Sequence, residues 1–280
     1  MGPDAFLTAF VAWAEARGDV KALLLLGSRA RTDTPADEWS DVDLTLVVEQ
    51  PDRYLGDGEW LEEFGRPLLT LVEPTAVGSA FERRVLYEDG LDVDVAVVTA
   101  EWLEHAAADP ETAGVVKRGA RVLVDKIALA DLLAKATSTE PERPLPTELE
   151  LAELGTDFWY HAVWAAKKLA RGEVLVAKRS VDGYLKEQLL TLLAWHAASS
   201  KPAVDTWHEA RFVERWADPR AVEAMREAYA RYDRDDLARA LRATMDIFER
   251  FERETAAKLG LPQPPDRARV RGLVGDVLNA

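Results

Sequence analysis

The stretch that decides the fold is residues 20–48, VKALLLLGSRARTDTPADEWSDVDLTLVV. Two apolar runs, 20–26 and 42–48, enclose a polar segment rich in turn-forming residues. Short runs of Val and Leu that stop at glycine or at polar residues are typical of buried β-strands. The stretch therefore predicts two strands joined by a long loop, which begins with a Gly-Ser pair.

Paired aspartates open two of the predicted strands. Asp41 and Asp43 open the second strand of this stretch, and Asp92 and Asp94 open another one further along the chain. Alternate residues of a strand share a face, so each pair presents two carboxylates in one direction. Crowded carboxylates repel one another unless a cation binds them, and Mg²⁺ prefers oxygen ligands while leaving positions for phosphate oxygens. We expect Asp41, Asp43 and Asp94 to bind magnesium.

The second pair also supplies a proton acceptor. A hydroxyl nucleophile must lose its proton, and either Asp94 or Asp92 could accept it. Metal charge would offset the negative charge that develops as the hydroxyl attacks the α-phosphorus of a nucleotide. The pattern therefore predicts nucleotidyl transfer by in-line displacement, with the base shared between these two aspartates.

The Gly-Ser pair is suited to a phosphate. Gly27 lets the backbone approach closely, Ser28 can donate a hydrogen bond, and amides of the following turn can assist. We expect these two residues and the adjoining Arg29 to contact the triphosphate of ATP. In the second half of the chain, Lys178 belongs to a basic pair that either reaches phosphates or lies on a solvated helix face.

A proline-rich segment, TSTEPERPLPT at 137–147, divides the chain. Before it helices and strands alternate, and after it apolar residues recur with the 3.6-residue period of amphipathic helices. The predicted class is α+β: a nucleotidyltransferase domain with a mixed β-sheet and flanking helices over 1–136, a linker, and an all-α helical-bundle domain over 148–280. Further strands are expected at 68–72, 84–87, 92–98 and 121–124, and helices at 4–17, 59–64, 100–107, 112–118, 147–171, 173–198, 207–216, 219–231 and 234–258.

Composition excludes several classes of protein. The formal net charge is −15, and residues 1–135 hold 26 acidic against 13 basic side chains, so the first half repels a phosphate backbone. No apolar run approaches the length of a membrane span, cysteine is absent, and no signal-peptide pattern is visible. We therefore expect a cytoplasmic protein without a nucleic-acid, membrane or protein partner.

The run LLGSRARTDTPADEWSDVDLTLVV (25–48) resembles the aminoglycoside 6-adenylyltransferases, which are streptomycin adenylyltransferases of the polymerase-β-like nucleotidyltransferase superfamily. The similarity continues through WLEEFGRPLLTLVEP (60–74), VLYEDGLDVDVAVV (85–98), VLVDK (122–126) and FWYHAVWAAKKLARGEVLVAK (158–178). It covers nearly the whole chain. The resemblance implies Mg²⁺-dependent transfer of AMP from ATP to a hydroxyl of a cationic aminoglycoside such as streptomycin, with release of pyrophosphate.

For individual residues, the resemblance implies the phosphate and metal roles given above and favours Asp94 over Asp92 as the base. It also points to Lys167 and Glu173 in the helical half. The nucleotide-contacting residues are then expected to be Gly27, Ser28, Arg29, Lys167 and Lys178, and the acceptor-contacting residues Glu88, Asp89, Trp159 and Glu173.

Two alternatives remain open. A nucleotidyltransferase of this fold could act on another small molecule or transfer AMP to a protein, as the antitoxin partners of nuclease toxins do, although those chains are usually short single domains. The chain could instead be a non-catalytic nucleotide-binding module. Such a module, however, gains nothing from four crowded carboxylates.

Overall fold

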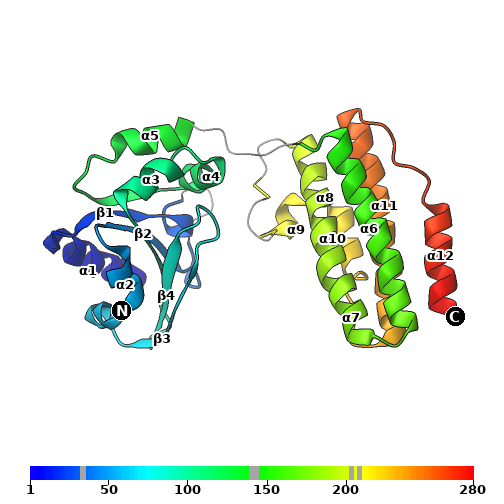
Figure 1. The fold of residues 1–280 in the computed structure, drawn as a ribbon, viewed down its shortest axis with the longest axis horizontal. Helices are drawn as coiled ribbons and strands as arrows, with labels where there is room; N and C mark the ends of the chain where they lie inside the picture. Colours follow the sequence, from blue (N-terminus) through cyan, green and yellow to red (C-terminus); the bar gives the residue numbers. More distant parts are fainter. Residues whose placement is uncertain (32–35, 139–144, 202–204, 207–209) are drawn as a thin grey trace. The chain divides into compact units, whose positions relative to one another are not determined.

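The computed structural model describes residues 1–31, 36–138, 145–201, 205–206 and 210–280. The chain forms two compact units, 1–143 and 144–280, each with its own hydrophobic core (Figure 1). The first unit contains a mixed sheet with helices and the second is helical, which confirms the predicted α+β class. The segment predicted as a linker falls largely on 139–144, which lie outside the described residues.

Six strands form the sheet of the first unit, in the order β3-β4-β5-β2-β1-β6. The pair β2·β5 is parallel, and the other four neighbouring pairs are antiparallel. The bounds are β1 (Val20–Leu25), β2 (Val42–Val48), β3 (Pro67–Pro74), β4 (Phe81–Tyr87), β5 (Asp92–Val98) and β6 (Arg121–Asp125). All the predicted strands are present, but β4 begins three residues earlier than expected.

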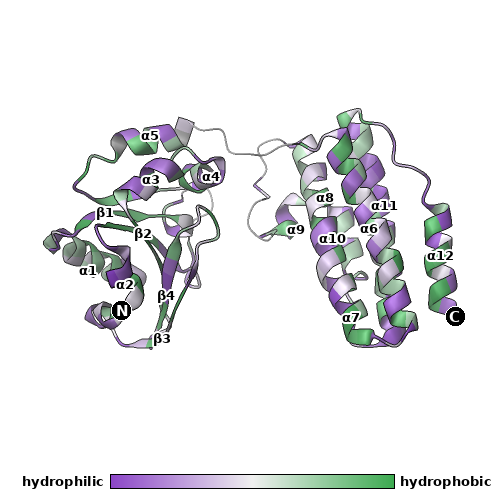
Figure 2. Cartoon of the chain, viewed as in Figure 1, coloured by the Kyte–Doolittle hydropathy of each residue, from purple (hydrophilic) through white to green (hydrophobic). Residues whose placement is uncertain are grey.

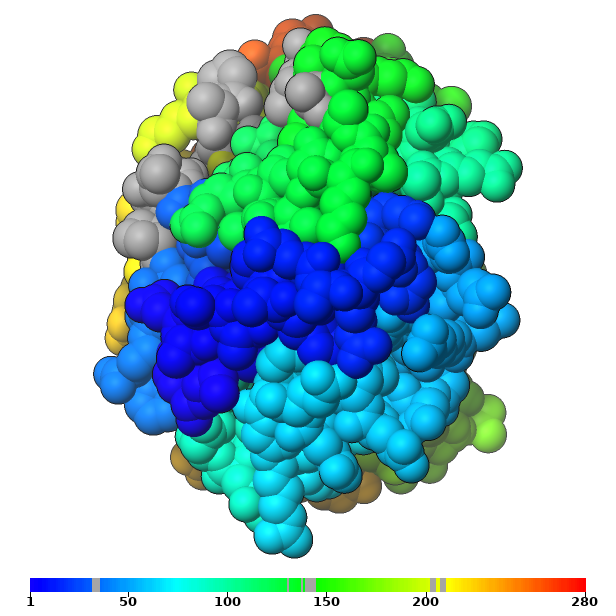
Figure 3. Space-filling model, turned by 90° about the vertical axis from the view of Figure 1, so that its left-hand side faces the viewer, coloured from blue at the N-terminus to red at the C-terminus, as the bar shows by residue number. Residues whose placement is uncertain are grey.

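One face of the sheet is covered by α1 (Pro3–Ala16), α2 (Pro51–Gly56) and the 3₁₀ helix η2 (Glu59–Phe64). Aromatic side chains of these helices, such as Phe6 and Phe10, pack on Val and Leu of the strands. In the space-filling view of the chain, α1 (dark blue) lies between α5 (green) and the segment around η2 and β3 (cyan) (Figure 3). Burial of this apolar surface is the main stabilising contribution to the first unit.

The opposite face of the sheet carries a small apolar cluster at one end of β2 and β5 and aspartates at the other end. Val47 and Val98, near the carboxyl ends of β2 and β5, belong to a small cluster with residues of α3 (Ala100–Ala106) and α5 (Ala130–Ser138). The helix α4 (Pro110–Arg118) packs against α5. Because side chains alternate along a strand, Asp43 and Asp94 lie on this same face, at the amino ends of the two strands.

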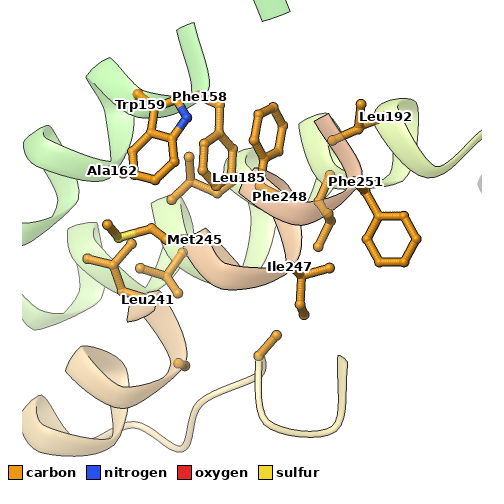
Figure 4. Packing of buried hydrophobic residues seen from close by; sticks show 14 of the residues in the cluster. Phe158, Trp159, Ala162, Leu185, Leu192, Leu241, Met245, Ile247, Phe248 and Phe251 are labelled. Atoms are coloured by element: carbon orange, nitrogen blue, oxygen red, sulfur yellow. The ribbon is translucent and has the colours of Figure 1, made fainter. Parts of the chain in front are cut away.

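The second unit is built from helices that carry both hydrophobic and hydrophilic residues (Figure 2). Their bounds are α6 (Glu148–Ala170), α7 (Val174–Arg179), the π-helical turn η3 (Ser180–Tyr184), α8 (Leu185–Ser200), α9 (Val213–Trp216), α10 (Pro219–Met225), α11 (Arg234–Leu259) and α12 (Ala268–Asn279). Phe158 of α6 stacks on Phe248 of α11 with ring centroids 3.7 Å apart, at the centre of the core (Figure 4). No helix in the described part of the chain is long and apolar enough to cross a membrane.

Several predicted helix bounds are wrong. The helix expected at 173–198 is interrupted by the π-helical turn, and the one expected at 219–231 ends at Met225. The helix expected at 207–216 is reduced to α9, because Phe212 has a left-handed backbone with φ 56°; residues 207–209 lie outside the described residues. Three helices, α2, α5 and α12, were not predicted.

Candidate active site

Three carboxylates meet where β2 and β5 begin. The parallel register places Asp43 beside Asp94, and Asp41 directly precedes β2. One carboxylate oxygen from each of the three lies within 4.8 Å of the others. Oxygen ligands at this spacing fit a small divalent cation such as Mg²⁺, which would also relieve their mutual repulsion.

Gly27 lies against the Asp43 carboxylate. Its backbone is left-handed with φ +64°, and a Cβ at this position would stand 1.9 Å from Asp43 Oδ2. The backbone is fixed there because the Leu26 amide donates to the Asp43 carbonyl at 2.9 Å. Both the backbone conformation and the close approach therefore require glycine at position 27.

Ser28 and Arg29, in the short 3₁₀ helix η1 (Gly27–Arg29), differ in their surroundings. The Ser28 hydroxyl is buried and has no hydrogen-bond partner among the described residues. An unsatisfied buried hydroxyl is costly, so a ligand oxygen at this position would stabilise the site. Arg29 instead donates from Nε to the Asp41 carbonyl at 2.8 Å and from Nη2 to the Ser40 carbonyl at 2.6 Å. It holds the backbone that carries the first acid.

Asp94 has a fixed counter-ion. Arg84 of β4 lies opposite it in register and donates from Nε to Oδ1 and from Nη2 to Oδ2, both at 2.7 Å. The third guanidinium nitrogen donates to Glu73 Oε1 at 3.0 Å. Burial raises the pKa of Asp94 to about 6, the charges of nearby aspartates add to this rise, and Arg84 opposes it. Each carboxylate oxygen retains a lone pair beyond the one that Arg84 uses, so Asp94 can still bind a cation or accept a proton.

A fourth acid, Glu82, shares this environment and was not predicted as a site residue. It lies on β4 two positions from Arg84 and therefore on the same face. Burial raises the pKa of Glu82 to about 7, and the charges of Asp94, Glu73 and Asp41 contribute in the same direction. The alternation of Glu82 and Arg84 would have revealed it if the strand had been predicted to begin at residue 81.

The remaining predicted residues of the first unit lie near the β4–β5 turn. Asp92 lines a pocket together with Arg84. Glu88 forms an ion pair with Arg66 at 3.2 Å, and Asp89 binds the amino group of the N-terminus. Both turn acids therefore already have cationic partners.

Two of the predicted polar residues of the second unit bind partners within that unit. Lys178 donates to Asp182 at 2.5 Å and to the Ala230 carbonyl at 2.6 Å. Glu173 accepts from Lys168 at 2.9 Å, and this bond lowers the pKa of Glu173. Lys167 is exposed on α6.

One predicted substrate contact is wrong. Trp159 is only 2% exposed and belongs to the core of the helical unit, where its ring packs edge-on against Phe158. An indole that is buried in this way cannot stack on a sugar or a base. Phe158 and Trp159 of this helix segment form core, whereas Tyr160 next to them is 68% exposed.

Comparisons with known proteins agree with the predicted family. The sequence model of the streptomycin adenylyltransferase family matches residues 4–271. The aminoglycoside 6-adenylyltransferase of Bacillus subtilis (strain 168) is 23% identical over 252 residues, which are 88% of this chain and 87% of the relative. The Staphylococcus aureus enzyme of the same name is 25% identical over 186 residues, or 64% of each chain. A crystal structure of an aminoglycoside 6-adenyltransferase from Bacillus subtilis covers 98% of both chains at 18% identity, with a TM-score of 0.48.

The family match spans nearly the whole chain and includes both acidic strands and the helical half. It confirms the resemblance that the motifs predicted. The chain therefore belongs to the streptomycin adenylyltransferase family and is a nucleotidyltransferase.

Proposed function

We propose that the protein is a Mg²⁺- and ATP-dependent O-adenylyltransferase that transfers AMP to a hydroxyl of an aminoglycoside such as streptomycin and releases pyrophosphate. The observation that carries the proposal is the meeting of Asp41, Asp43 and Asp94 beside Gly27 and the Ser28 hydroxyl, which has no hydrogen-bond partner among the residues that the structure describes. The names of the relatives support the acceptor class.

The first unit would bind the nucleotide triphosphate. The backbone at Gly27 and the hydroxyl of Ser28 are available to phosphate oxygens, while Arg29 keeps the Asp41 backbone in place. Asp41, Asp43 and Asp94 would hold magnesium. When bound, the metal supplies positive charge that offsets the charge developing on the reacting phosphate.

Asp94 is the proposed base, and Asp92 is the alternative. The acceptor oxygen forms a bond to the α-phosphorus, the bond to pyrophosphate breaks, and the hydroxyl proton passes to the carboxylate. Arg84 keeps the Asp94 carboxylate oriented through two hydrogen bonds. Asp92 is part of a surface pocket and has the more open position.

We assign the chemistry to residues 1–136 and acceptor binding in part to residues 148–280, with 137–147 as the linker. Lys167 and Lys178 would contact the nucleotide, and Glu88, Asp89 and Glu173 the acceptor. Lys178, Glu173, Glu88 and Asp89 each have an ion partner among the described residues, and the carboxylates among them keep lone pairs that a cationic acceptor could use. The cysteine-free composition supports a cytoplasmic location.

A pyrophosphate-release assay tests the proposal. The protein is incubated with ATP and Mg²⁺ in the presence of aminoglycosides, and in parallel with uncharged hydroxyl compounds. Streptomycin or a close cationic relative should stimulate release, and mass spectrometry should show addition of AMP to it. Stimulation by uncharged compounds alone would contradict the acceptor class and leave the transferase chemistry intact.

A further inference from the structure

A groove lies on the sheet beside the acid cluster, mainly on β3 and β4, which the predicted site does not use. It is lined by Leu69, Leu71 and Glu73 of β3, Arg84 and Leu86 of β4, and Asp92 of β5, with a contribution from Val85. It belongs entirely to the first unit, so its description does not depend on the helical unit.

The strand register connects this groove to the proposed reaction centre. Leu71 lies opposite Arg84, and Arg84 lies opposite Asp94, so the three occupy one row across the sheet. The next row contains Leu69, Leu86 and Asp92. Because neighbouring strands are about 4.8 Å apart, Leu71 stands roughly 10 Å from the proposed base. This distance matches the width of one or two sugar rings.

The groove combines apolar and negatively charged side chains, and this combination indicates which kind of ligand it can bind. Leu69 and Leu71 are 63% and 49% exposed, so the edge strand β3 presents apolar surface on this face. Glu73 and Asp92 add carboxylates at the polar side, and Arg84 is already shared between Glu73 and Asp94. A negatively charged nucleotide is repelled by these acids. A ring with an apolar C–H face could contact the leucines, and an ammonium or guanidinium substituent on it could bind the carboxylates.

We propose that this groove is a subsite for the acceptor, in which Leu69 and Leu71 contact the face of a cationic ring and Glu73, together with Asp92, binds its charged group. The proposal rests on the proposed function. It adds β3 to the site and places one acceptor ring next to the reacting carboxylates.

Two groove variants test the subsite with streptomycin as the probe. Leu69→Ser/Leu71→Ser removes the apolar contact, and Glu73→Gln removes one charge. Each should raise the KM for streptomycin about tenfold, keep kcat within about twofold and leave the KM for ATP unchanged, the pattern of lost ground-state binding. Leu149→Ser, at an exposed leucine of the helical unit, and Glu223→Gln, which breaks an exposed pair with Arg226, serve as matched controls.

Salt dependence separates a binding role of Glu73 from a structural one. Screening weakens an ammonium–carboxylate contact, so the KM of the wild type should rise with ionic strength and that of Glu73→Gln should rise less. If kcat falls and KM stays constant in Glu73→Gln, this glutamate acts through Arg84 on Asp94, and the binding role is wrong.

The outcomes also separate this inference from the proposed function. A wild type that turns over streptomycin while both groove variants keep its KM overturns the subsite alone. A wild type that is inert towards every aminoglycoside overturns the proposed function, and the subsite with it. Melting curves and circular dichroism of the variants establish that they are folded.

Discussion

Asp43 has close neighbours on two sides of its carboxylate in the acid cluster. It lies against Gly27 on one side and beside Asp94 on the next strand. Asp43→Asn should lower transfer more than ~10²-fold, because an amide lacks the charge that binds magnesium. Initial rates over a range of Mg²⁺ concentrations provide the measurement. Near-normal turnover of the folded variant would contradict the metal assignment.

Gly27 permits a test of the close approach itself. In Gly27→Ala the new methyl group must displace the Asp43 carboxylate, and the left-handed backbone adds about 1 kcal/mol of strain. We expect activity to fall more than ~10²-fold. Gly260→Ala is the matched control, because Gly260 has a similar φ of +67° and its Cβ would meet nothing within 4 Å. Equal losses of activity in the two variants would show that backbone strain alone is responsible.

Glu82 predicts a pH dependence of stability. Its pKa is about 7 in the folded protein against 4.5 as the ordinary value, so the folded state binds more protons between these pH values. Its contribution therefore lowers the free energy of unfolding as pH rises from 4.5 to 7. Glu82→Gln should raise the Tm at pH 8 and change it little at pH 5. Glu101→Gln, at an exposed glutamate of α3, is the control. If Glu82→Gln leaves the Tm at pH 8 unchanged, burial of the ionised Glu82 carboxylate does not destabilise the fold.

At the scale of elements, β5 carries two candidate bases on one face. Asp94→Asn should abolish transfer, while calorimetry with ATP and Mg²⁺ still detects binding, because Asp41 and Asp43 remain. Asp92→Asn should retain most of kcat. The reverse result, an inactive Asp92→Asn beside an active Asp94→Asn, would assign the base to Asp92.

The π-helical turn between α7 and α8 holds a buried cation. Lys186 donates to the Val181 carbonyl and to Thr244 Oγ1, both at 2.8 Å, and burial lowers its pKa to about 8 from 10.5. Between these pH values the unfolded chain binds more protons, so the free energy of unfolding rises with pH, by on the order of 3 kcal/mol across the window. Urea unfolding at pH 7.5 and 9.5 should show this rise in the wild type and its loss in Lys186→Met. Lys201→Met, at an exposed lysine after α8, should behave like the wild type.

The sequence predicted the aspartates of the site and their strands, but it did not predict which residues of neighbouring strands contact them. Within each strand, alternation predicted that Asp41 and Asp43 share a face and that Asp92 and Asp94 share a face; the pairing of β2 with β5 puts Asp43 and Asp94 on the same side of the sheet. The register that sets Arg84 opposite Asp94 depends on how the turn at 88–90 closes, and alternation within one strand does not contain that information.

Helix ends show a similar division. Gly172 and Gly260, which lie just beyond the predicted helices 147–171 and 234–258, both have a left-handed backbone. The turn at 210–212 and the π-helical turn were missed, because apolar residues keep a nearly helical spacing through both. Trp159 was wrongly assigned to the substrate, since the periodicity shows that a side chain is on an apolar face and not what that face packs against.

At the scale of the whole molecule, the change from alternating elements to a 3.6-residue period predicted the two kinds of architecture, because each unit buries its own core. The unit that holds the three clustered aspartates is also the one in which acidic residues outnumber basic ones. Helix α12 was missed even though it has 12 residues, and Val270, Val274, Val277 and Leu278 recur along it at helical spacing and pack on the core of the second unit.

The parallel pairing of β2 with β5 brings together two aspartates that the ribosome synthesises at different times. Asp43 and Asp94 are 51 positions apart in the chain, so at 5–20 residues per second the ribosome adds the second aspartate roughly 3 to 10 s after the first. Arg84 is synthesised within that interval. The nascent chain therefore contains the counter-ion of Asp94 before it contains Asp94, and the last carboxylate of the cluster joins a chain that already carries its cationic partner.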